Sequence, residues 1–265
     1  MYSQKEVMDF IKEENVGSIR LTFCDIFGNA KNISIMSSEI ERAFCDGISF
    51  DASAIRGFTG EERSDLFLHP DPKTLSILPW GPEHSRVIRM FCDIKNPDGS
   101  PYPHDSRHIL KEAVKTAQDA GIHCNFGPEY EFYLFRTNEN GESNHEPFDH
   151  AGYMDIAPED RCENIRREIC FALSDMNIHP ESSHHEEGPG QNEIDFRYSD
   201  ALQSADNAIT FKTVVKTMAM RNGLIADFSP KPLSDQPGNG MHINFSVRSG
   251  DGVDHMPQVI AGIMD

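Results

Sequence analysis

The sequence predicts an α+β protein of two parts, a small N-terminal unit and a larger unit built on an antiparallel sheet. Segments in which apolar and polar residues alternate, as in half-buried strands, are interspersed with segments of helical periodicity. The stretch NPDGSPYPHDS, residues 96–106, is rich in Pro, Gly and Ser, as linkers between domains are. We therefore expect one domain at residues 1–98 and a second at residues 104–265.

The N-terminal unit is predicted to open with a helix at residues 3–15, followed by a hairpin. The strands of this hairpin are SIRLTFCDI and KNISIM, and FGNA between them has the composition of a turn. A short helix is expected at residues 37–47, where Gly47 follows the last periodic residue. The remaining strands are expected in ISFDASAIRGF, TLSILPW and SRVIRMFCDI.

The larger unit is expected to contain three helices. Asp105 caps the first, which Gly121 ends, and the other two fit residues 160–177 and 200–222. Segments with strand-like alternation lie between the helices. The three with the most unusual polar residues are EYEFYLF, NEIDFRY and MHINFSV.

The composition is strongly acidic. Among 265 residues, 43 are Asp or Glu and 24 are Lys or Arg, which gives a formal net charge of −19. Such a chain should repel nucleic acids and anionic membrane surfaces, so we expect neither as a partner. The six cysteines include no C-x-x-C pair and lie mostly in apolar runs. We therefore expect reduced and largely buried thiols. With no signal peptide at the start and no apolar run near the roughly 20 residues that span a bilayer, we expect a cytoplasmic protein.

Each of the three unusual strands has one apolar and one polar face, because alternate side chains of a strand share a face. The polar faces carry, in order, Glu129, Glu131 and Tyr133; Glu193, Asp195 and Arg197; and His242, Asn244 and Ser246. For any single strand the simplest interpretation is an ordinary antiparallel sheet with one side in water. A solvated face favours Thr, Lys and Arg, however, whereas carboxylates predominate on these strands.

If the strands share one sheet, a cluster of four carboxylates and one imidazole is expected: Glu129, Glu131, Glu186, Glu193 and His242. Four carboxylates this close cannot all stay ionised without cations. Oxygen ligands with one imidazole suit Mg²⁺ or Mn²⁺, and two or more metals per site are typical of enzymes that act on phosphates. His184 and His185 are interpreted as structural residues. On these residues alone, a two-metal phosphohydrolase is an alternative, although its short Asp-rich motifs are absent.

Four segments carry a resemblance to a known family. GPEYEFYLF, HHEEGPGQNEIDFRY, PKPLSDQPGNGMHINFS and FDASAIRGF resemble signatures of glutamine synthetase of the bacterial class I type. The resemblance implies a small β-grasp-like N-terminal domain and a catalytic domain with a curved antiparallel sheet and flanking helices. It also implies a homo-oligomer, a dodecamer in the family, with active sites between subunits.

The reaction implied by the resemblance joins glutamate and ammonium, with ATP as co-substrate, through γ-glutamyl phosphate. By their places in the motifs, Glu131, Glu186 and Glu193 match ligands of one metal, and Glu129 and His242 match ligands of a second that bridges the ATP phosphates. The other matched positions are Glu181, Asn244 and Ser246 for the nucleotide, Gly238 for glutamate, and Asp51 and Asp65, acids that a neighbouring subunit lends to bind and deprotonate ammonium.

Three departures accompany the resemblance. Pro237 stands where the glutamate-binding loop of the family commonly has Asn, and DASA replaces the commoner Asp-Gly-Ser-Ser. The chain ends in HMPQVIAGIMD, the start of a helix without a C-cap, whereas the family's catalytic domain continues. We therefore expect a catalytic domain that is incomplete at its C-terminal end and inactive by itself. The alternatives are a relative that ligates glutamate to another amine and a non-catalytic metal-binding fragment.

Overall fold

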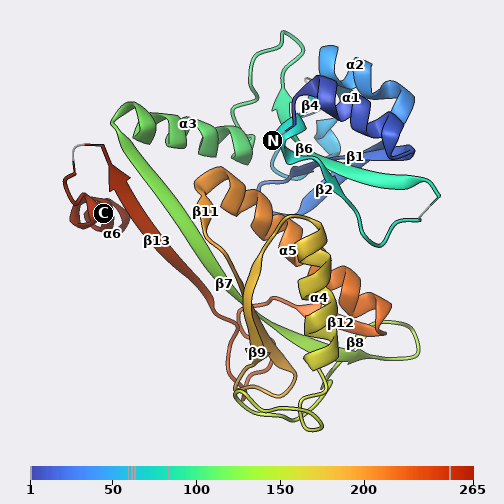
Figure 1. Cartoon of the computed structure of the whole chain (residues 1–265), viewed down its shortest axis with the longest axis vertical. Helices are drawn as coiled ribbons and strands as arrows, with labels where there is room; N and C mark the ends of the chain where they lie inside the picture. Colours follow the sequence, from blue (N-terminus) through green and yellow to red (C-terminus); the bar gives the residue numbers. More distant parts are fainter. Residues whose placement is uncertain (1, 59, 61, 63, 83, 251) are drawn as a thin grey trace. The chain divides into compact units, whose positions relative to one another are not determined.

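The computed structural model describes residues 2–58, 60, 62, 64–82, 84–250 and 252–265. The chain divides into two compact units, Met1–Thr116 and Ala117–Asp265, each with helices and a sheet (Figure 1). The predicted α+β class is therefore confirmed. The division falls inside helix α3 (Ser106–Asp119), which directly follows the linker-like stretch. In the described part of the chain, no helix combines the length and apolar character that a membrane crossing requires.

The first unit contains a sheet with strand order β2-β1-β6-β4-β3, in which β5 also pairs with β6. The strands are β1 (Val16–Cys24), β2 (Ala30–Met36), β3 (Ile48–Asp51), β4 (Asp65–Pro70), β5 (Ser76–Ile77) and β6 (Arg86–Lys95). The helices are α1 (Gln4–Glu13), α2 (Ile40–Cys45) and the 3₁₀ turns η1 (Ser37–Glu39), η2 (Ala52–Ala54) and η4 (Pro72–Thr74). β1 and β6 run parallel, and the other pairs are antiparallel.

Local sequence explains how this unit forms. Ser3 caps α1 in a capping box, because its side chain accepts from the Glu6 amide while the Glu6 carboxylate accepts from the Ser3 amide. The helix then buries Val7 and Ile11 in the same core as the central strands. Strand β4 is not among the predicted strands, because DLFLHP is short and ends at Pro70 between two turn-rich stretches.

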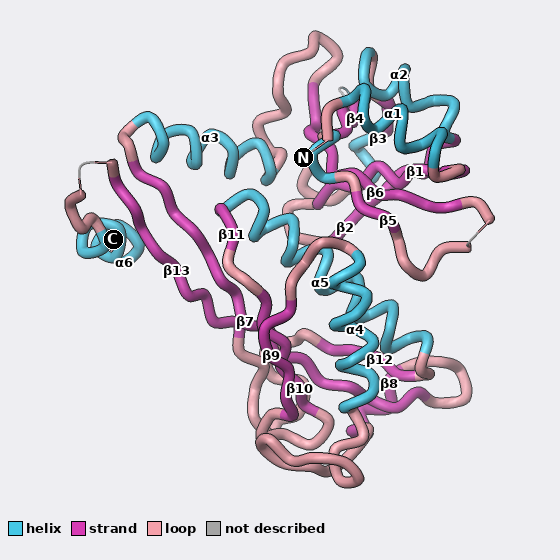
Figure 2. The backbone as a smooth tube through the Cα atoms, in the orientation of Figure 1, coloured by secondary structure: helices cyan, strands magenta, loops and turns pink. Residues whose placement is uncertain are grey.

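The second unit contains a sheet of antiparallel pairs organised around one long strand, β7 (Ile122–Thr137). The other strands are β8 (Ser143–Pro147), β9 (Pro180–His185), β10 (Gln191–Phe196), β11 (Ser199–Asp200), β12 (Leu224–Asp227) and β13 (Met241–Ser249). β7 pairs directly with β8, β10, β11, β12 and β13, and β9 pairs with β10. Figure 2 shows β7 and β13 as two long neighbouring strands. The helices are α4 (Glu163–Asp175), α5 (Ala201–Arg221) and α6 (Met256–Met264).

Aromatic packing decides which face of the second sheet is apolar. Phe211 of α5 is fully buried, and its ring centroid lies 5.2 Å from that of Tyr130 and 6.2 Å from that of Phe132, both on β7. Phe196 of β10 packs on the same ring at 5.6 Å. The alternation along β7 therefore turns Glu129 and Glu131 to the opposite face of the sheet.

The cysteines only partly match the expectation of buried thiols. The six cysteines all lie in the described residues and form no disulfide. Cys92 and Cys162 are buried, whereas Cys45 is exposed. Burial disfavours the thiolate and raises the pKa of the Cys92 thiol well above its ordinary value. Cys92 is therefore a structural side chain and not a reactive one.

Candidate metal and nucleotide site

Two rows of polar residues cross the second sheet on its polar face. In the first row, Glu129 of β7 lies between Asp195 of β10 and His242 of β13. In the next row, Glu131 lies directly opposite Glu193 of β10, and its amide donates to the carbonyl of residue 240 at 3.2 Å. Because directly opposite residues in a ladder share a face, these five side chains gather on one surface.

Glu186 reaches the same surface from the turn between β9 and β10. Its carboxyl meets that of Glu193, and one of its oxygens lies 3.5 Å from Nδ1 of His184. Burial, then the neighbouring carboxyls of Asp195 and Glu186, raise the pKa of Glu193 to about 8. The cluster thus holds more carboxylates than it can keep ionised without positive charge.

The donor set of this surface fits a hard divalent cation. Oxygen or nitrogen atoms of His184, Glu193 and Asp195 lie within 4.8 Å of one another. Oδ1 of Asp195 is buried and has no hydrogen-bond partner among the described residues, so one lone pair is left for a ligand. In the first row, Nδ1 of His242 lies 3.6 Å from Oε2 of Glu129. Carboxylates with imidazoles are the ligands that Mn²⁺ and Mg²⁺ accept.

The loop before β13 packs directly on this surface. A Cβ atom at Gly240 would lie 2.5 Å from Oε1 of Glu131 and 2.9 Å from Cε1 of His242, so a larger residue here would displace these two side chains. Gln191, fully buried, donates to Oε2 of Glu131 at 2.8 Å and to the carbonyl of Gly238 at 3.0 Å. One side chain therefore ties a candidate metal ligand to the predicted glutamate-binding loop.

Pro237 in the same loop is held through its backbone. The hydroxyl of Tyr133 donates to the Pro237 carbonyl at 2.7 Å. Burial, with the negative charge of Glu131 nearby, raises the pKa of Tyr133 to about 12, so this hydroxyl remains a donor. Pro237 in place of the family's Asn therefore changes the side chain at this position, while the backbone carbonyl still accepts the hydrogen bond from Tyr133.

A pocket of about 350 Å³ lies beside the first row of acids. Its lining includes all three residues predicted to bind a nucleotide, Glu181, Asn244 and Ser246. Asn244 donates to Oε1 of Glu129 at 2.6 Å, so this pocket is continuous with the candidate metal site. Tyr198 and Arg248 also line the pocket and supply an aromatic ring and a positive charge.

Asp51 and Asp65 lie together in the first unit. They are directly opposite residues at the end of the β3–β4 pair. The side chain and backbone amide of Ser53 donate to Asp51 at 2.6 and 2.9 Å and lower the pKa of its carboxyl. Two acids opposite each other in a ladder destabilise the sheet, which is a reason to look for a cationic ligand there.

Three further residues of this surface are not assigned a role from sequence alone. Asp195 shares the strand parity of Glu193, and that parity places it on the polar face. His184 lies directly opposite Glu193 on β9, and the two-residue period of SSHH could have placed it on that face. Gln191 also shares the strand parity of Glu193, which places it on the polar face, although parity alone does not mark its contact with Glu131.

The fold and the site together define a two-domain α+β protein whose second unit has a candidate divalent-cation site on the polar face of an antiparallel sheet. Two family models match the chain, "Glutamine synthetase, beta-Grasp domain" over residues 15–97 and "Glutamine synthetase, catalytic domain" over residues 103–258. The chain belongs to the glutamine synthetase family, and the β-grasp-like N-terminal domain is confirmed.

Curated relatives and solved structures agree with this family. Glutamine synthetase of Clostridium saccharobutylicum is 47% identical over 246 residues, 93% of this chain and 56% of that protein. The Methanosarcina mazei enzyme is 45% identical over 92% of this chain and 55% of its own length. Plasmodium falciparum glutamine synthetase superposes with a TM-score of 0.84 at 27% identity, over 95% of this chain and 55% of that one. A solved GmaS/ADP complex gives 0.84 at 29% identity, over 93% of this chain and 56% of that one. The chain spans about half the length of the curated relatives it matches.

Proposed function

We propose that this chain provides the metal- and nucleotide-binding part of a glutamine synthetase, which ligates ammonium to the γ-carboxylate of glutamate through γ-glutamyl phosphate with ATP as co-substrate. The observation that carries the proposal is the pair of polar rows across β7, β10 and β13. Transfer of a phosphoryl group to a carboxylate brings two anions together, and metal ions bridging the phosphate oxygens offset their repulsion. We also propose domains at residues 1–98 and 104–265 and a cytoplasmic location, where ATP and glutamate are available.

Each row would serve one Mg²⁺ or Mn²⁺ ion. Glu131, Glu186 and Glu193 would hold the metal nearer to glutamate, and Glu129 with His242 would hold the metal nearer to the ATP phosphates. A bound metal supplies positive charge to the phosphate and carboxylate oxygens. The raised pKa of Glu193 supports this assignment, because a bound cation would offset the repulsion that now favours its protonated form.

The substrates would lie on either side of these metals. The pocket lined by Glu181, Asn244 and Ser246 would take the adenosine, and Tyr198 offers a ring at its edge. The similarity to the solved GmaS/ADP complex supports a nucleotide in this fold. Glutamate would lie against the loop that contains Gly238, which Gln191 joins to Glu131.

Asp51 and Asp65 would act in an assembly. We propose a homo-oligomer, a dodecamer by analogy with the family, in which the acids of one subunit approach the metal site of its neighbour. Two opposed carboxylates attract a small cation such as ammonium and can accept a proton from it. The stability lost to their repulsion would be recovered when the cation binds.

The first test is binding by the 265-residue chain. The wild type should bind Mn²⁺, measured by loss of the free-ion EPR signal, and should bind ADP more tightly when Mn²⁺ is present. Glu131→Ala should weaken both, because it removes a carboxylate that faces Glu193. Glu139→Ala on the β7–β8 turn is the control, since it removes an equal charge outside the site. A chain that binds no Mn²⁺ would refute the proposal.

The second test separates this function from its alternatives. We expect the 265-residue chain alone to show no appreciable ADP release that depends on both glutamate and ammonium at saturating Mg²⁺ and ATP, because it spans about half the length of its curated relatives. Turnover that disappears in Glu131→Ala would mean that this chain is an active ligase by itself. Turnover with methylamine and without ammonium would favour a ligase for another amine. Metal and ADP binding without turnover is the expected result for the chain alone, and it is shared with a non-catalytic binding fragment.

A further inference from the structure

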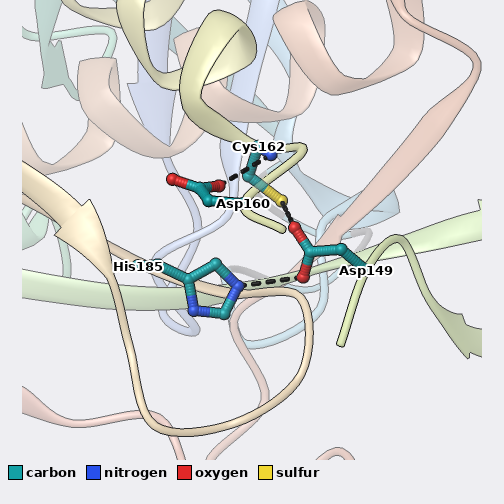
Figure 3. A group of neighbouring side chains, drawn as sticks. All are labelled: Asp149, Asp160, Cys162 and His185. Carbon is teal, nitrogen blue, oxygen red and sulfur yellow. Dashed lines mark hydrogen bonds and ion pairs between the residues drawn. The ribbon is translucent and has the colours of Figure 1, made fainter. Parts of the chain in front are cut away.

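A second group of polar residues is buried beneath the candidate site. Three of them, Asp149, Asp160 and Cys162, lie between β8 and α4, and His185 ends β9; the four side chains point toward one another (Figure 3). Each of the four residues is at most 4% exposed. Buried polar groups of this density are tolerated only when their hydrogen bonds are made.

These four residues are better suited to a hydrogen-bond network than to a metal. The guanidinium of Arg166 already pairs with Asp160, at 2.5 Å between Nη2 and Oδ2, so a further cation would be repelled. The thiol of Cys162 donates to Oδ2 of Asp149 at 3.3 Å. Burial, then Asp149, raise the pKa of Cys162, which disfavours the thiolate that a metal needs.

Asp149 is the acceptor at the centre of this network. Its Oδ2 accepts from the backbone amide of Arg161 at 2.9 Å as well as from Cys162. Its Oδ1 accepts from the amide of Gly190 and from Nε2 of His185, both at 2.9 Å. These two donors stand on opposite sides of the turn between β9 and β10, which contains Glu186.

His185 extends the network to Glu186 itself. Its Nδ1 lies 2.7 Å from the carbonyl oxygen of Glu186 and donates to it, since a carbonyl has no proton to give. Gly190 has a φ of 69°, in the left-handed region, so the far end of the turn is also fixed in a conformation that favours glycine. The turn is thus fixed at both ends, and Asp149 contacts both.

We propose that Asp149 is a positioning residue which, through His185 and Gly190, holds the Glu186 carboxylate where a metal can bind. This inference rests on the proposed function, because Glu186 matters only if the site binds metal. Partners behind the ligands orient them, and their loss typically lowers metal affinity roughly 10- to 100-fold.

Asp149→Asn is the direct test. Asn has the same shape but replaces one oxygen by an NH₂ group, so residue 149 can no longer accept all four hydrogen bonds. We expect Mn²⁺ affinity, measured by EPR on the full chain, to fall by roughly tenfold or more. Asp160→Asn is the matched control: it removes an equally buried carboxylate of the same network that contacts Arg166 and the Cys162 amide and not the turn. It should lower the Tm at least as much while changing Mn²⁺ affinity less.

A pair of His185 variants provides a second measurement. His185→Gln places its amide nitrogen near Nε2 and keeps the contact with Asp149 but loses the one with Glu186. His185→Asn places its nitrogen near Nδ1 and keeps the contact with Glu186. Each variant breaks the connection from Asp149 to Glu186 at one of its two links, so both should bind Mn²⁺ more weakly than the wild type. If Asp149→Asn does not fold, wild-type Mn²⁺ affinity in both His185 variants would overturn the positioning role.

The outcomes distinguish the two proposals. A wild-type chain that binds no Mn²⁺ overturns the proposed function, and the role of Asp149 with it. A wild type that binds while Asp149→Asn binds within about twofold of it overturns only the positioning role. Equal losses in Asp149→Asn and Asp160→Asn also overturn it, because the network would then be merely structural.

Discussion

Glu193 should make the stability of the metal-free chain depend on pH, and a substitution of this one residue can measure its contribution. Its pKa rises from 4.5 to about 8, first through burial and then through Asp195 and Glu186. Between these values unfolding releases a proton, so the free energy of unfolding of the metal-free chain should fall as pH rises from 4.5 to about 8. Glu193→Gln removes this contribution. The Tm of the wild type minus that of the variant, measured in EDTA, should decline across this window and be constant below it; a difference independent of pH contradicts the prediction.

Individual site residues could be predicted from sequence where the two-residue alternation of a strand determines the face to which their side chains point. Glu129, Glu131, Glu193 and His242 share a face because alternate residues of a strand must, and the register brings them into adjacent rows. His184 obeys the same rule but is interpreted as structural from sequence, because a histidine alone more often is. The network of Asp149 could not be predicted, because its partners are two backbone amides, a thiol and a histidine, all at least twelve residues away in sequence.

The loop before β13 gives a prediction at the scale of an element. Gly240→Ala should push aside the Glu131 carboxylate, 2.5 Å from the added methyl, and leave the backbone in place, since the obstacle is the end of a flexible side chain. Mn²⁺ affinity should fall while the Tm stays close to that of the wild type. Gly250→Ala adds the same methyl where, apart from its chain neighbours, no described residue lies within 4 Å, and it should change neither quantity. A large loss of Tm with unchanged affinity would be the contrary result.

Strand β7 shows what the sequence pattern of an element can hide. The alternation predicts a strand from Glu129, whereas the strand begins at Ile122. Gly127 and Pro128 suggest a break, because both are unfavourable inside strands. They lie where the pairing with β11 ends at Phe126 and that with β10 begins at Glu129, while β13 continues on the other side. The interruption is tolerated because β11 and β10 pair with β7 on either side of Gly127 and Pro128, while β13 stays paired along the opposite edge.

At the scale of the whole molecule, the net charge of −19 makes any cation a potential stabiliser, so specific binding must be separated from screening. Mn²⁺ at 100 times its dissociation constant should add about 2.7 kcal/mol to the free energy of unfolding by mass action. NaCl at matched ionic strength should raise the Tm less, and Glu131→Ala should reduce the Mn²⁺ response to that of NaCl. Equal responses of the wild type to both salts would mean that screening alone operates.

The single long strand at the centre of the second unit has a consequence for how that unit is made. The strands that pair with β7 lie within residues 143–249. Most hydrogen bonds of β7 therefore cannot form until those residues have left the ribosome. Closing such long loops is slow, and an apolar strand that waits for partners is open to pairing with another chain. The nascent protein is therefore expected to be most prone to aggregation in the interval between the synthesis of β7 and that of β13.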